Sequence, residues 1–246
     1  MSTVNVQSSI PAQTSSKLSA PENLGKPNTE ASYPGFNIIL MGPNGTGKTY
    51  SIGTLVDSGL EVFYLALEPG LESLIGYFTD PVPGGKGLKE PPANLHWHYI
   101  QTRTQGFSQM KDTADKIGKF DLSGLAKMRD MNRAQNNPMI KLYEVLNDFI
   151  DQKDGKKYGP VDDWGTDRVL VIDGLSALSR IAMEMVTGDK PVRDKPDYGI
   201  AQGNLMSLIH KLTSGCMCHI VLIAHVNREI DEVMGGVKLM PNSIQR

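Results

Sequence analysis

The chain is poor in cysteine: only Cys216 and Cys218 occur among its 246 residues. Their close spacing does not favour a disulfide between them, so we expect a reducing compartment. His219 follows directly, but the three residues match no usual zinc-ligand spacing and lack an evident fourth ligand. Burial at the start of a strand is therefore the preferred interpretation of both cysteines, ahead of a metal site.

Long apolar runs and an excess of one charge are also missing. No stretch approaches the roughly 18 apolar residues that a membrane-spanning helix needs. The first residues lack the basic cluster and apolar core of a secretory signal. The net charge of −2 excludes a global positive field that would attract nucleic acid or an anionic membrane. We expect a cytoplasmic globular protein with no membrane partner, in which any DNA binding comes from local patches.

Composition divides the chain into two parts. Residues 1–33 are rich in Ser, Thr, Pro, Asn and Gln and hold few large apolar groups, so burial cannot offset their ordering entropy. They are predicted to form a flexible tail. Residues 34–246 are predicted to form one domain, with a helical insertion near residues 104–135, where the sequence is polar and weakly periodic.

Short apolar segments predict a mainly parallel sheet. Residues 36–41 read as a buried strand before a glycine-rich turn, a helical pattern then runs to Ser58-Gly59, and residues 61–67 form a second strand. Strand, helix and strand within about 30 residues is the unit of a parallel sheet. Residues 168–172 and 220–224 are predicted central strands, so the fold class is α/β, with a central sheet flanked by helices.

The glycine-rich turn carries a complete phosphate-binding motif. It has the pattern G-x-x-x-x-G-K-[ST] and lies between a predicted strand and a predicted helix, which is the context that the motif requires. Glycines let backbone N–H groups turn toward phosphate, and the helix N-terminus adds its positive end. Lys48 is predicted to reach the β- and γ-phosphates, and the hydroxyl of Thr49 to bind Mg²⁺. The predicted nucleotide-binding residues are Gly42, Pro43, Asn44, Gly45, Thr46, Gly47, Lys48, Thr49 and Tyr50.

Two carboxylates at strand ends complete the predicted site. Asp173 follows an apolar strand, as the metal-binding aspartate of P-loop proteins does, and is predicted to hold Mg²⁺ through water. Glu68 ends the strand after the loop helix, at the edge where open α/β sheets bind ligands, and is predicted to orient the attacking water. The neighbouring Glu72 is the alternative. No Asn-Lys-x-Asp guanine motif occurs, which favours ATP over GTP.

These segments together resemble the RecA-like ATPase core. The resemblance rests on residues 42–49, 63–68 and 169–178, whose order and spacing agree with that family. Residues 67–72 and 240–243 make the chain similar to the short phage-encoded RecA-like ATPases associated with single-strand annealing and recombination. The resemblance implies ATP hydrolysis with Mg²⁺, action on single-stranded DNA, a homo-oligomer, a recombination or annealing partner protein, and a host cytoplasm.

The resemblance also implies roles for single residues. It supports Glu68 as the group that activates water, and it places His225, where many members carry glutamine, as a sensor of the γ-phosphate. Arg228 is implied as a phosphate contact in its own subunit or a neighbour's. The open alternatives are a core histidine and an ordinary surface arginine.

Two loops are implied to hold single-stranded DNA, residues 184–200 and residues 229–242. Nearby aspartates nearly cancel the basic residues of the first loop, and neither loop offers the set of aromatic platforms that a strong base-stacking site has. Solvated surface loops are the alternative for both. The implied DNA contacts are Lys190, Arg193, Lys195 and Lys238.

Other functions stay open on the sequence. One is a nucleotide-dependent protein switch or loader with slow turnover and no direct DNA binding. Another is a small-molecule kinase, which commonly adds an arginine-rich lid that is not evident here. RecA-like domains usually add strands beyond the position of Arg246, so we expect either a truncated chain or a minimal family member.

Overall fold

The structure of the chain is a computed structural model. The predicted tail, residues 1–33, and part of the predicted insertion lie outside the described residues. The structure describes residues 34–81, 84–101, 107–127, 137–188, 190, 192–230, 237–241 and 243.

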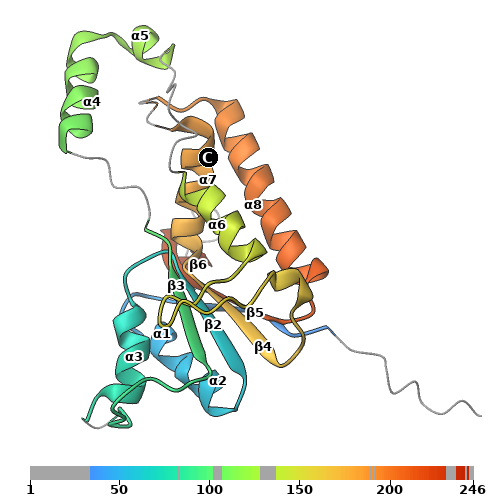
Figure 1. Ribbon diagram of the computed structural model, residues 1–246. Helices are drawn as coiled ribbons and strands as arrows, with labels where there is room; N and C mark the ends of the chain where they lie inside the picture. The colour runs from blue at the N-terminus through green and yellow to red at the C-terminus, as the bar shows by residue number, and fades with distance from the viewer. Residues whose placement is uncertain are drawn as a thin grey trace, which may run out of the picture. The chain divides into compact units, whose positions relative to one another are not determined.

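Six strands of the described chain form one sheet (Figure 1). Their order is β1-β5-β4-β2-β3, all pairs along this path are parallel, and β6 pairs antiparallel with the far end of β5. The mainly parallel sheet confirms the predicted α/β fold. The strands are β1 (Asn37–Gly42), β2 (Glu61–Ala66), β3 (Leu95–Tyr99), β4 (Arg168–Asp173), β5 (His219–Ile230) and β6 (Val237–Pro241).

Helices follow most of the strands. The single helix predicted after the glycine-rich turn is divided at Ile52 into two short helices, and two helices lie within the predicted insertion. No helix in the described residues is long and apolar enough to cross a membrane. The helices are α1 (Lys48–Ser51), α2 (Gly53–Asp57), α3 (Leu71–Thr79), α4 (Phe107–Lys119), α5 (Leu122–Ala126), α6 (Pro138–Asn147), α7 (Leu175–Thr187) and α8 (Lys195–Gly215), with a 3₁₀ turn η1 (Val161–Asp163).

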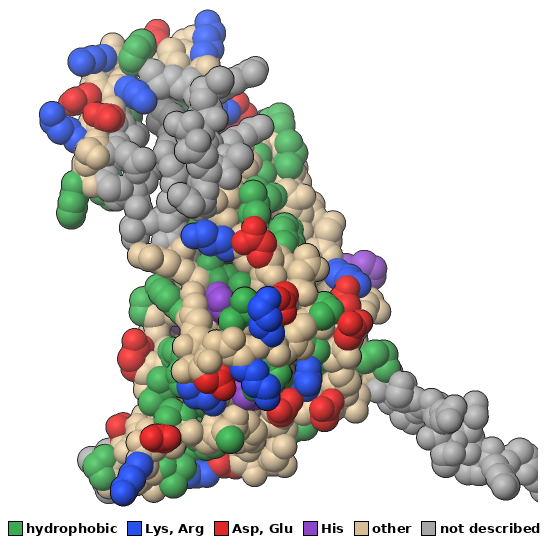
Figure 2. All heavy atoms as spheres, viewed as in Figure 1, with side chains coloured by type: hydrophobic (Ala, Val, Ile, Leu, Met, Phe, Trp, Pro, Cys, Tyr) green, Lys and Arg blue, Asp and Glu red, His purple; other side chains and the backbone are tan. Residues whose placement is uncertain are grey.

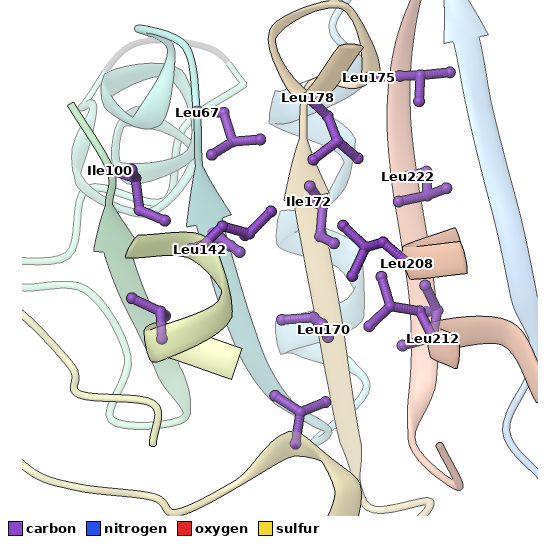
Figure 3. Packing of buried hydrophobic residues seen from close by; sticks show 14 of the residues in the cluster. Leu67, Ile100, Leu142, Leu170, Ile172, Leu175, Leu178, Leu208, Leu212 and Leu222 are labelled. Carbon is purple, nitrogen blue, oxygen red and sulfur yellow. The ribbon is translucent and has the colours of Figure 1, made fainter. Parts of the chain in front are cut away.

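The two faces of the sheet bury different clusters of side chains. Along β2, Phe63 and Leu65 point to the face covered by α6, α7 and α8, and Val62 and Tyr64 point to the face covered by α2 and α3. The alternation is the period of two that a strand imposes. Figure 3 shows the first cluster, in which Leu67, just after β2, and leucines from β4 and β5 pack against leucines from the helices. Burial on both faces explains why the central strands are almost continuously apolar.

The first strand differs from the prediction of a buried strand. β1 lies at the end of the sheet and pairs only with β5 among the described strands, and Ile38, Ile39 and Met41 are each about half exposed. On the opposite edge strand, β3, the backbone of Tyr99 is hydrogen-bonded by a side chain. Its N–H donates to the amide oxygen of Gln152, and its carbonyl accepts from the amide nitrogen. An apolar run alone cannot distinguish an edge strand from a central one, because the difference depends on neighbours far along the chain.

Described residues of both predicted DNA loops belong to helices or strands. Within residues 184–200, α7 continues to Thr187 and α8 already begins at Lys195, so the two helices form an antiparallel hairpin (Figure 1). The start of α8 is fixed by a capping box, in which the side chains of Asp194 and Asp197 accept each other's backbone N–H groups. Of residues 229–242, residues 229–230 end β5 and residues 237–241 form β6, which pairs antiparallel with β5.

Candidate nucleotide-binding site

The loop between β1 and α1 has the backbone that a phosphate-binding loop needs. Gly45 and Gly47 have φ angles of 74° and 81°, in the left-handed region that side chains with a Cβ rarely adopt. A Cβ built at either glycine would meet no atom within 4 Å, so the requirement for glycine is conformational. Thr46, between them, closes the turn by donating its hydroxyl hydrogen to the Pro43 carbonyl at 2.8 Å.

The side chain of Lys48 lies against the same loop. Its ammonium group donates to the carbonyl of Gly42 at 3.0 Å and to the carbonyl of Pro43 at 2.7 Å, and the residue is buried. Gly42 and Pro43, the first two residues of the predicted motif, therefore hold the Lys48 side chain through their carbonyl oxygens. The remaining motif residues, Asn44 through Thr49, line a cleft together with Tyr50, which follows the motif.

Strand register brings the other predicted residues to the same edge of the sheet. Gly42 at the end of β1 is paired with His225 in β5, and Asp173 at the end of β4 is paired with Ala66 in β2. Glu68 follows two residues after Ala66. The carboxyl ends of parallel strands therefore meet beside the glycine-rich loop, as the sequence predicts for an open α/β sheet.

A hydrogen bond joins the loop helix to β4. The hydroxyl of Thr49 donates to Oδ2 of Asp173 at 2.7 Å, and the hydroxyl of Tyr64 donates to the same oxygen. Burial, and then the charge of Asp173, raise the pKa of Tyr64 far above its usual value, so the phenol stays protonated and acts as a donor. Tyr64 is a contact that the sequence analysis missed, because it lies 109 residues from its partner.

The predicted general base faces the predicted sensor. Nε2 of His225 lies 3.2 Å from Oε2 of Glu68, and a Cβ built on Gly174 would lie 3.4 Å from the same carboxylate oxygen. The Glu68 carboxylate is thus held between the β5 imidazole and the backbone after Asp173. The alternative base, Glu72, is exposed in the first turn of α3 and does not line the cleft.

These groups surround a cleft of about 690 Å³. Arg180 of α7 also lines it and was missed by the sequence analysis, although Ser176, Arg180 and Glu184 follow one another at helical spacing from the end of β4. Tyr50 lines the cleft, but its hydroxyl donates to the carbonyl of Gly84. The complete lining is Asn44 to Tyr50, Glu68, Pro69, Gly70, Ser73, Arg180 and His225.

Comparison with known proteins identifies the family. A family model described as an AAA domain matches residues 35–243. The chain belongs to this family of AAA-type domains. No curated protein matches the chain. Membership, together with the loop and sheet geometry, supports nucleotide binding and ATPase activity of the P-loop class.

The oxygen set of this AAA-type domain fits Mg²⁺. Thr49 supplies a hydroxyl and Asp173 a carboxylate, 2.7 Å apart beside the phosphate loop, and Mg²⁺ usually binds through one or two protein oxygens plus substrate phosphates. Elsewhere in the described residues, no cluster of three or more His, Cys, Asp or Glu side chains forms a metal cage. Cys216 and Cys218 are free and buried, and burial raises the pKa of Cys218 to about 12, which disfavours the thiolate that metals require.

The residues implied to contact DNA are spread over different parts of the AAA-type domain. The ammonium group of Lys190 is already bound by Asp194 at 2.5 Å and by Asp197 at 3.1 Å. Arg193, just before α8, and Lys195, its first residue, are exposed. Figure 2 shows Lys and Arg side chains interspersed with Asp and Glu on one face of the molecule. The side chains of Arg228 and Lys238 lie outside the described residues, and their backbones belong to β5 and β6.

Proposed function

We propose that this AAA-type domain hydrolyses ATP in the cleft beside its glycine-rich loop, with Glu68 as the general base. The observation that carries the proposal is the convergence of β2, β4 and β5 beside that loop: Asp173 is bonded to Thr49 at 2.7 Å, and Glu68 faces His225 at 3.2 Å. A phosphate-binding loop alone would serve binding. The facing carboxylate adds a group that can accept a proton from water.

In the proposed reaction, the Glu68 carboxylate orients a water molecule and accepts its proton as the oxygen attacks the γ-phosphorus. The bond between that phosphorus and the β–γ bridging oxygen breaks, and ADP leaves with the electron pair. Lys48 and the loop N–H groups hold the phosphates, and His225 and Arg180 lie where they can donate to the developing charge. Bound at Thr49 and Asp173, Mg²⁺ would neutralise charge on the β- and γ-phosphates.

The test is ATP turnover by wild type and by Lys48→Ala. The lysine contributes a charge that is buried with the phosphates, so we expect its loss to reduce turnover by about 10²-fold or more. Turnover is measured as phosphate release at fixed Mg²⁺. Activity that persists unchanged in Lys48→Ala would come from a contaminant or from another site, and the proposal would be wrong.

We also propose single-stranded DNA as the polymer on which the ATPase acts, in phage-type recombination or annealing. What supports it is the resemblance to RecA-like proteins and the exposed pair Arg193 and Lys195 at the start of α8. Such a small basic cluster gives only a modest, salt-dependent affinity for DNA, because each phosphate contact contributes little alone. The test adds single-stranded or duplex DNA to the turnover assay, and stimulation by single strands is the expected result.

The second candidate is a nucleotide-dependent switch or loader that acts on a protein partner. One observation favours it: Lys190, a residue implied to contact DNA, is neutralised by Asp194 and Asp197. Nucleotide binding that is retained, with turnover insensitive to either form of DNA, would support the switch. In that outcome Arg193→Ala and Lys195→Ala leave turnover unchanged.

A further inference from the structure

A buried tyrosine outside the phosphate-binding motif contacts the carboxylate that the proposed metal site needs. Tyr64 is fully buried in β2, and its hydroxyl donates to Oδ2 of Asp173, the oxygen that also accepts from Thr49 at 2.7 Å. Asp173 itself is only 6% exposed. One carboxylate oxygen is therefore shared by a donor from the loop helix and a donor from the sheet interior.

The position of Tyr64 follows from the register of β2 and β4. Tyr64 is paired with Val171 and Ala66 is paired with Asp173, so Tyr64 lies one pleat before Asp173 on the adjacent strand. Because side chains alternate along a strand, Tyr64 and Asp173 project from the same face of the sheet. Ala66, directly across from Asp173, carries only a methyl group, and the phenol reaches past it to the carboxylate.

The shared oxygen restricts what the Asp173 carboxylate can do. A buried carboxylate needs hydrogen-bond donors, and each donor at a fixed position selects one orientation of the carboxylate plane. Among the described residues, Oδ1 of Asp173 accepts no hydrogen bond, so both protein donors act on Oδ2. The hydrogen of the Thr49 hydroxyl is committed to Asp173, which leaves the lone pairs of that hydroxyl for a cation.

We propose that Tyr64 is a positioning residue for the Mg²⁺–nucleotide complex. Its hydroxyl holds the Asp173 carboxylate in the orientation in which Thr49 and Asp173 present their oxygens together, before the nucleotide arrives. The inference rests on the proposed ATPase function of the same cleft. Removing a group that hydrogen-bonds a metal ligand, without contacting the metal itself, commonly lowers metal affinity by 10- to 100-fold.

The test variant is Tyr64→Phe, which keeps the buried ring and removes only the hydroxyl. Binding of methylanthraniloyl-ADP is followed by fluorescence during a Mg²⁺ titration and again in EDTA. The expected result is that half-maximal Mg²⁺-dependent binding needs on the order of tenfold more Mg²⁺, with the affinity in EDTA unchanged. Turnover of ATP at saturating Mg²⁺ should return close to the wild-type value, which a general packing defect would not produce.

The matched control is Tyr77→Phe. Tyr77 of α3 also donates its hydroxyl to a carboxylate, Asp57, at 2.6 Å, but on the surface of the domain. We expect it to leave the Mg²⁺ titration unchanged. Thermal unfolding of both variants shows whether either one is impaired in folding.

The outcomes separate this inference from the proposed function. If wild type binds nucleotide with no dependence on Mg²⁺, the proposed metal-dependent function fails and the role of Tyr64 fails with it. If wild type depends on Mg²⁺ and Tyr64→Phe gives the same titration, only the role of Tyr64 is overturned. A loss of affinity that is equal in Mg²⁺ and in EDTA would also overturn it, because the tyrosine would then act on the fold as a whole.

Discussion

The imidazole of His225 and the carboxylate of Glu68 lie 3.2 Å apart, Nε2 to Oε2, between β5 and the turn after β2. The other ring nitrogen, Nδ1, is buried and has no hydrogen-bond partner among the described residues. A single polar contact therefore orients this imidazole, and it is made to the residue that would activate water. The pair links the strand that follows α8 to the chemistry of the cleft.

Replacing Glu68 by glutamine tests the general base. The amide keeps the size of the side chain and can still contact His225, but it cannot take up the proton from water. We expect kcat for ATP to fall by about 10²- to 10⁴-fold, with nucleotide affinity retained. Steady-state turnover and methylanthraniloyl-ADP binding measure the two effects separately.

The control for this change is Glu72→Gln. Glu72 is exposed in the first turn of α3, four residues from Glu68, and does not line the cleft. Its replacement should leave kcat within about twofold of wild type, since surface substitutions away from a site are usually mild. If Glu72→Gln were inactive and Glu68→Gln active, the assignment of the base would have to be exchanged.

Two replacements of His225 distinguish hydrogen bonding from packing. Glutamine carries an amide donor that can replace Nε2 toward Glu68 or phosphate, whereas alanine removes the donor. We expect His225→Ala to lower kcat by about 10²-fold with little change in KM, because the donor acts on charge that develops in the transition state. His225→Gln should stay within about tenfold of wild type.

Both variants are compared with wild type in steady-state kinetics, with thermal unfolding as the check on folding. Equal kcat for His225→Ala and wild type would show that the imidazole is only a core residue. Equal losses in His225→Ala and His225→Gln, without loss of stability, would show instead that the ring itself is required.

The sequence predicted the parts of the site that local patterns encode. The motif ending in Lys48 and Thr49 specifies its own loop, and the apolar segments before Glu68 and Asp173 are recognisable as strands that end in carboxylates. The structure places all of these around one cleft or against its loop. What they share is that strand, turn and helix signals are short-range, so a window of about ten residues contains them.

The contacts that the sequence missed depend on register between distant strands. Tyr64 looks like an ordinary core residue until β2 is paired with β4, and Arg180 looks like a surface arginine until α7 is placed above the cleft. The missed start of α8 is different, because Asp194-Lys195-Pro196-Asp197 carries a helix-start signal in the sequence itself. The resemblance implied a DNA-binding loop over these residues, so the helix start was not predicted.

Gly53 is expected to tolerate no larger side chain, although it lies at the start of α2. A Cβ built there would lie 2.2 Å from Cδ1 of Tyr77. That ring is held by edge contacts with Tyr50 and Phe78 and by its hydroxyl bond to Asp57. Overpacking should therefore outweigh the gain in helix propensity, and Gly53→Ala should lower the free energy of unfolding by about 1–3 kcal/mol.

Urea unfolding measures this effect, with Gly203→Ala as the matched control. Gly203 is exposed in α8, and a Cβ built there would meet nothing within 4 Å. Its replacement should raise the free energy of unfolding by about 0.5–1 kcal/mol, because glycine is the poorer helix former. A rise in both variants would mean that the Tyr77 ring moves aside at little cost.

His96 is expected to make stability depend on pH near neutrality. The residue is buried, with Nδ1 2.8 Å from Oδ2 of Asp151 and 3.1 Å from the hydroxyl of Tyr158; Glu61 and Lys153 are the other charged groups nearby. Burial lowers the pKa of His96, and the bond to Asp151 opposes this only in part. The imidazole is therefore neutral in the folded protein at a pH where the unfolded chain begins to bind a proton.

The sign of the effect follows from that difference. As pH falls through about 6.5, the usual pKa of histidine, the unfolded chain takes up a proton before the folded one does. The free energy of unfolding should then decrease by up to about 1.4 kcal/mol per pH unit until the folded pKa is reached. Urea unfolding of wild type, His96→Gln and His210→Gln at pH 7.5, 6.5 and 5.5 measures this change in the free energy of unfolding. His210→Gln is the control, because His210 is exposed on α8. His96→Gln should lose less stability on acidification than the other two.

If wild type instead gained stability relative to His96→Gln, the ion pair between a charged His96 and Asp151 would outweigh the cost of burial, and the direction argued for the pKa of His96 would be wrong.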